Sequence, residues 1–80
     1  MGAYELVEGH ILGISPVKEY KPGKTMAQVR FIQTGSERPE LLAVYGGTIP
    51  YVQEAEGAEV WVELRHQDSG KKMITQVVNF

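Results

Sequence analysis

Apolar and polar side chains alternate one by one along much of the chain, which is the pattern of a β-strand with one buried face. Residues 25–33 show it most clearly, because Ala27, Val29 and Phe31 fall on one side of the strand. The opposite side carries Met26, Gln28, Arg30 and Ile32. Successive side chains of a strand point to opposite faces of the sheet. We therefore expect the first set in a core and the second set on the surface.

Four further segments have the composition of strands. They are residues 6–14, 40–45, 58–64 and 71–80. The first contains Gly9 and Gly13, which suit a strongly bent strand with a bulge or corner. Ser15-Pro16 marks the end of its regular pairing, since proline cannot donate a ladder hydrogen bond.

Turn residues separate the expected strands. Lys21-Pro22-Gly23-Lys24 and Gln67-Asp68-Ser69-Gly70 are turn sequences, and residues 34–39 form a polar loop. In residues 48–56, Thr48 is placed to cap a helix that Pro50 limits to about two turns. The order is three strands, a short helical or irregular crossover between strands 3 and 4, and a closing hairpin. This order predicts an all-β fold in which residues 1–80 form one five-stranded barrel of the oligonucleotide/oligosaccharide-binding (OB) type.

The composition limits the cellular environment and the binding partners that we expect for this protein. The 80 residues include no cysteine, which excludes disulfides and cysteine-based zinc sites and favours a reducing cytoplasm. No apolar run of about 18 residues is present, and the first five residues lack the features of a targeting signal, so we expect no membrane partner. The net charge is −2, which disfavours a dedicated duplex-DNA binder.

Catalytic and metal-binding motifs are missing from the sequence. His10 and His66 are the only histidines, and they stand far apart without ligands at metal-binding spacing. No serine lies in a nucleophile motif, and Gly46-Gly47 lacks the lysine and further glycines of a phosphate-binding loop. We expect a protein that is not an enzyme and needs no cofactor or metal.

Five segments together resemble a known family. They are residues 8–16, 27–31, 42–46, 56–63 and 68–72. In order and spacing they are similar to the strands and the last turn of bacterial single-stranded-DNA-binding proteins and of the related primosomal replication protein. The resemblance implies an OB barrel that binds single-stranded nucleic acid and assembles into a homo-oligomer, a dimer or a tetramer.

Nine residues are candidates for nucleic-acid binding. Tyr45 and Trp61 are out of phase with the valines beside them, so both rings are expected to face outward, where a base can stack on them. Each ring can instead pack under a loop or at a subunit interface. Arg30 and Gln28 share the outer side of their strand, where an arginine can contact phosphate or simply be solvated. The turns add candidates for backbone contacts and stacking: Lys18, Tyr20, Lys24, Lys71 and Lys72.

Two functions remain open at this level. The first is a non-catalytic nucleic-acid-binding module, with single-stranded DNA as its expected ligand. The second is an oligomeric protein-interaction module or accessory subunit, which the net negative charge and the outward apolar residues Met26, Ile32 and Leu41 favour. A small barrel of the SH3-like or Sm-like type is a third alternative for the fold.

Overall fold

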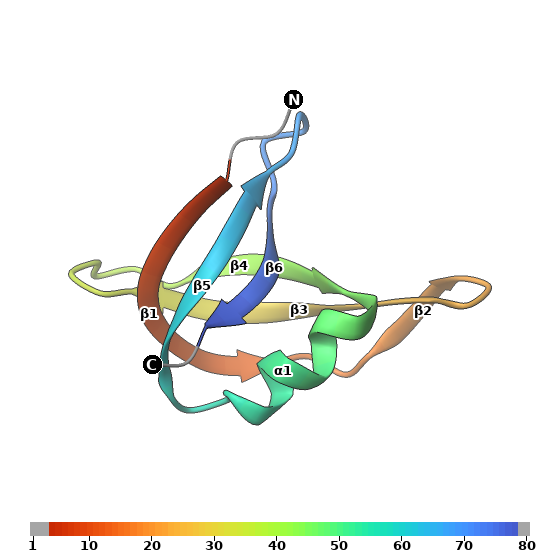
Figure 1. Ribbon diagram of the computed structural model, residues 1–80, viewed down its shortest axis with the longest axis horizontal. Helices are drawn as coiled ribbons and strands as arrows, with labels where there is room; N and C mark the ends of the chain where they lie inside the picture. The colour runs from red at the N-terminus through yellow and green to blue at the C-terminus, as the bar shows by residue number, and fades with distance from the viewer. Residues whose placement is uncertain (1–3, 79–80) are drawn as a thin grey trace.

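Strands dominate the computed structural model, which describes residues 4–78 (Figure 1). In chain order the elements are β1 (Tyr4–Ile14), β2 (Lys18–Lys21), β3 (Lys24–Gln33), β4 (Glu40–Tyr45), a 3₁₀ turn η1 (Gly46–Thr48), the helix α1 (Ile49–Glu54), β5 (Glu59–His66) and β6 (Lys72–Val78). The last two residues of the expected closing strand, 79 and 80, lie outside the described part of the chain.

The strands close into a barrel. Their order in the sheet is β1-β5-β6-β4-β3-β2. An additional pairing of β1 with β3 closes a ring of five strands, and β2 lies outside this ring. β4 and β6 run parallel, whereas the other pairs are antiparallel. One short helix lies between β4 and β5. This architecture confirms the expected all-β fold, a five-stranded OB-like barrel with a short helical crossover.

The core consists of the side chains that the alternating pattern placed inward. On β3, Ala27, Val29 and Phe31 are buried, and on β4 the buried side chains are Leu42 and Val44. The inward residues of β5 and β6 complete the interior: Val60, Val62, Leu64 and Ile74. Apolar burial of this kind is the main force that stabilises a small barrel.

β1 closes the ring because it bends from one partner strand to another. Its first half pairs with β5 and its second half with β3, and a bulge at Leu12 interrupts the register between Ile11 and Gly13. At Gly9 the strand crosses so close to β3 that an added Cβ would overlap the Phe31 ring and the Ile32 carbonyl oxygen. The expected bend at the two glycines is therefore confirmed.

The crossover covers one end of the barrel (Figure 1). Ile49 and Val52 of α1 are buried in the same core as the strands. Thr48 occupies the N-cap position, as expected, but its side chain makes no capping hydrogen bond, because the 3₁₀ turn before it already holds its backbone in a helical conformation. After the helix, the Gly57 amide donates to the Ile11 carbonyl at 2.8 Å, which ties the crossover to β1.

β2 is an element that the sequence pattern did not predict. It pairs only with β3, and together they form a hairpin that projects from the barrel (Figure 1). The expected turn Lys21-Pro22-Gly23-Lys24 lies at its tip, where Gly23 adopts a φ of 76°. This positive φ is costly for any residue with a Cβ.

Candidate nucleic-acid interface

The outer face of β3 and β4 carries three cross-strand pairs. Met26 lies opposite Tyr45, Gln28 opposite Ala43, and Arg30 opposite Leu41. Residues directly opposite one another in antiparallel strands point to the same face. Because the intervening residues fill the core, these six side chains point away from it and form a continuous outer surface.

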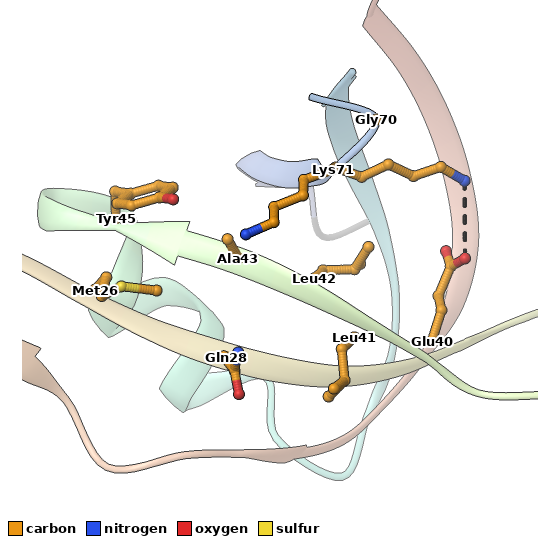
Figure 2. Close-up of a pocket in the computed structure, with 10 residues that line it drawn as sticks. Met26, Gln28, Glu40, Leu41, Leu42, Ala43, Tyr45, Gly70 and Lys71 are labelled. Atoms are coloured by element: carbon orange, nitrogen blue, oxygen red, sulfur yellow. Dashed lines mark ion pairs between the residues drawn. The ribbon is translucent and has the colours of Figure 1, made fainter. Parts of the chain in front are cut away.

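A groove of about 380 Å³ is hollowed into this face (Figure 2). Met26 and Gln28 of β3 line it, together with residues 40–43 and Tyr45 of β4. Gly70 and Lys71 of the turn before β6, with Lys72 at the start of β6, form its remaining wall. The groove therefore combines an apolar and aromatic floor with a basic wall.

The two lysines of the wall differ in their surroundings. Lys72 Nζ lies 3.7 Å from Glu40 Oε2, and both side chains are partly exposed. Lys71 forms no ion pair within residues 4–78, and in Figure 2 its side chain extends over β4 toward Ala43. Lys71 is thus the cation that this wall presents to a ligand, while a carboxylate partly neutralises Lys72.

The β2–β3 hairpin extends the face beyond Tyr45. The rings of Tyr20 and Tyr45 meet edge to face, with centroids 5.7 Å apart and an interplanar angle of 72°. Lys18 lies opposite Met26, and it lines a second hollow of about 270 Å³ that shares Met26 and Gln28 with the groove. The two hollows are therefore neighbouring parts of one surface.

A side-chain hydrogen bond fixes the strand beneath this shared part. The backbone amide of Gln28 donates to Ser15 Oγ at 2.8 Å, and the backbone amide of Ser15 donates to the backbone carbonyl of Gln28 at 2.8 Å. Ser15 thus continues the pairing of β1 with β3 past the end of β1. The outward direction of the Gln28 side chain follows from this held backbone.

Arg30 and Lys24 lie at the margins of the surface. Arg30 is exposed beside Leu41 and forms no ion pair within the described residues. Lys24 lies opposite Lys21 next to the turn of the β2–β3 hairpin, at the far end of this projection. Both add positive charge to the same side of β3.

Trp61 lies elsewhere on the barrel. Its neighbours Val60 and Val62 are buried, which confirms that the ring is out of phase with the core. Trp61 is half-buried and stands opposite Glu8 of β1 and Val78 of β6. The structure therefore groups Tyr45 with Tyr20, Gln28, Arg30 and the lysines but does not place Trp61 in their groove.

Glu40 and Ala43 were not predicted as parts of this site, and Met26 and Leu41 were predicted to favour protein contacts. The alternating pattern did signal that Met26 and Leu41 face outward. Glu40 gave no signal, because its contact with Lys72 joins two strands that are distant in the sequence.

Two further observations concern metal binding and membrane crossing. Among residues 4–78, no three His, Asp or Glu side chains lie close enough to hold a metal ion together. None of the helical segments in that range has the length and apolar character needed to cross a membrane.

Comparison of the chain with protein-family models, with curated proteins and with solved structures found no match.

Proposed function

We propose that the protein binds single-stranded nucleic acid, with single-stranded DNA as its main ligand, in the groove on the outer face of β3 and β4. The observation that carries this proposal is that Tyr45, whose ring contacts that of Tyr20, lines the same open groove as Lys71, which forms no ion pair within the described residues. Aromatic platforms beside a basic wall are what proteins use to hold single strands without reading their sequence.

Each part of the groove has a role in this proposal. Tyr45 stacks a base, which contributes about 1–3 kcal/mol. Lys71, Lys18 and Arg30 contact phosphates on either side of the stacked base. Gln28 hydrogen-bonds a base edge, since its amide offers both donors and an acceptor. The protein binds in this way without catalysing a reaction.

The net charge of −2 shapes the expected affinity. Long-range attraction of a polyanion is weak for an acidic protein, so stacking supplies a large share of the binding free energy. The lysines then act locally, and their contribution falls as salt rises. The lack of cysteine fits a location in the reducing cytoplasm, which we include in the proposal.

Fluorescence anisotropy with labelled oligo-dT at low salt tests the proposal. We expect saturable binding at or below tens of micromolar protein, and an affinity that decreases linearly with the logarithm of salt concentration. Absence of binding at tens of micromolar protein would refute the proposed function.

A second candidate function rests on the outer face of β1. Tyr4 and Leu6 are 60% and 53% exposed and project from the same side of this strand, and Leu12, at the bulge beyond Glu8 and His10, is 45% exposed. Exposed apolar side chains gathered on one surface are typical of protein contacts. We propose this face as a contact between subunits of a homo-oligomer, a dimer or a tetramer.

Light scattering coupled to gel filtration tests the second candidate. We expect a mass above that of one chain, and a shift toward one chain in the variant Leu6→Glu. Because Leu6 is exposed and lies outside the groove, this variant should keep its fold and its oligo-dT affinity. A single-chain mass at every concentration would exclude the oligomer.

A further inference from the structure

A separate hollow of about 340 Å³ lies where the crossover meets β6. Its lining comes from Gly47 and Thr48 of η1, from Tyr51 of α1, and from Thr75, Gln76 and Val77 of β6. Tyr51 is 63% exposed, although aromatic side chains usually bury a large area. The hollow therefore offers a second flat aromatic surface outside the groove already described.

The two ends of the β3–β4 groove differ in charge and in shape. At one end, Glu40 places a carboxylate beside Lys72, and this carboxylate repels phosphate. At the other end, Tyr45 is followed directly by Gly46 and Gly47. A Cβ added to either glycine would meet no atom within 4 Å, so the space directly beside both glycines is open.

The glycine pair leads from the groove to the second hollow. η1 contacts both β3 and β6, so it spans the space between the two sites. The backbone advances by about 10 Å between Tyr45 and Tyr51, which is the sum of three 3₁₀ steps of about 2 Å and three α-helical steps of about 1.5 Å. At about 3.4 Å per nucleotide, the spacing along one strand of duplex DNA, three nucleotides cover this distance.

The lining of the second hollow suits a base. Thr48 makes no capping hydrogen bond, so its hydroxyl is available to a base edge. Gln76 is exposed and adds an amide, whereas the Thr75 hydroxyl already donates to Glu63 Oε1 at 2.8 Å. Among the described residues that line the hollow none is acidic, although the Glu63 carboxylate lies behind Thr75 at the edge formed by β6.

From these observations we infer that a single strand bound in the groove leaves it at Tyr45, crosses Gly46 and Gly47, and stacks a further base on Tyr51. This inference rests on the proposed function and extends it by a second stacking site with a defined path. A strand long enough to reach both rings then binds more tightly than one that fills the groove alone.

A length series of labelled oligo-dT tests the inference. For the unaltered protein, we expect affinity to increase once the oligonucleotide is long enough to reach Tyr51. In Tyr51→Ala, this increase is lost, which lowers affinity for the long oligonucleotides by about 5- to 100-fold and leaves the short ones unchanged. Tyr51→Phe keeps the ring and keeps the increase.

A second variant tests the path rather than the ring. Gly47→Val places a side chain in the open space between the two sites, and the backbone there has no positive φ that would oppose it. We expect it to reduce affinity for long oligonucleotides in the same way as Tyr51→Ala. Thermal unfolding followed by circular dichroism verifies that both variants remain folded.

The outcomes separate this inference from the proposed function. Binding by the unaltered protein, with Tyr51→Ala and Gly47→Val unchanged at every length, overturns the second stacking site and leaves the groove intact. If the unaltered protein binds no oligonucleotide, both are overturned. If Tyr51→Ala alters only the mass measured by light scattering, the hollow is a subunit contact and the inference fails.

Discussion

The ring of Tyr20 meets the ring of Tyr45 edge to face, with 5.7 Å between their centroids. This contact joins the projecting β2–β3 hairpin to the end of β4, so it fixes Tyr45 beside the groove before any ligand arrives. Aromatic pairs of this geometry contribute about 0.5–1.5 kcal/mol beyond the area that they bury. A ring held in advance loses less conformational entropy on binding.

Tyr45→Ala should weaken binding of oligo-dT by about 5- to 100-fold, because it removes the stacking surface in the groove. Tyr45→Phe should keep most of the affinity, since the ring remains. Anisotropy titrations of both variants beside the unaltered protein provide the measurement. Equal affinity of Tyr45→Ala and the unaltered protein would show that bases do not stack on this ring.

Lys71→Gln should reduce the dependence of affinity on salt. For single strands, each phosphate contact contributes about 0.7 to the slope of log K against log salt concentration, so we expect the slope to fall by about that amount. Lys72→Gln is the matched control, because Glu40 already pairs with Lys72. A larger loss of slope in Lys72→Gln than in Lys71→Gln would contradict the assignment of the two lysines.

Glu40→Gln should strengthen binding. The substitution removes the carboxylate from one end of the groove and releases Lys72 for a phosphate contact, so the salt slope should become steeper by about 0.7. The double variant Glu40→Gln with Lys72→Gln should return the slope to its original value. The same anisotropy titrations over a series of salt concentrations measure both. A decrease in affinity in Glu40→Gln would mean that Glu40 supports the ligand rather than repelling it.

Short-range patterns in the sequence were sufficient to predict the barrel. Ala27, Val29 and Phe31 alternate with polar residues, and the core contains them because a strand with one apolar side must bury that side. Pro16 ends a strand because proline cannot donate a ladder hydrogen bond, and Pro22-Gly23 ends another because these residues favour turn dihedral angles. The same patterns placed Tyr45 and Trp61 outside the core, which the burial of their neighbours confirms.

Long-range pairing determined what the sequence did not reveal. β2 was missed because its four residues are all exposed, so no apolar periodicity marks it, and only its register with β3 makes it a strand. The outward phase of Tyr45 and Trp61 gave no information about which side of the barrel each occupies. That depends on strand order, which sets Tyr45 in the groove and Trp61 between β1 and β6.

Gly9→Ala should destabilise the barrel by about 3 kcal/mol, toward the upper end of the cost of overpacking. The added Cβ would overlap Phe31 and the backbone of Ile32, where β1 crosses β3. Gly13→Ala is the matched control on the same strand, because its nearest atom, Glu56 Oε2, is 3.9 Å away. Urea unfolding followed by circular dichroism measures both, and similar stability of the two variants would contradict the close crossing at Gly9.

The position of the ligand is tested most directly by amide and indole chemical shifts of ¹⁵N-labelled protein during a titration with oligo-dT. We predict that the largest shifts occur in residues of β3 and β4 that line the groove and at Lys71, with small changes at the Trp61 indole. Shifts concentrated around Trp61 and the outer face of β1 and β5, or no shifts at saturating oligo-dT, would contradict binding in the groove.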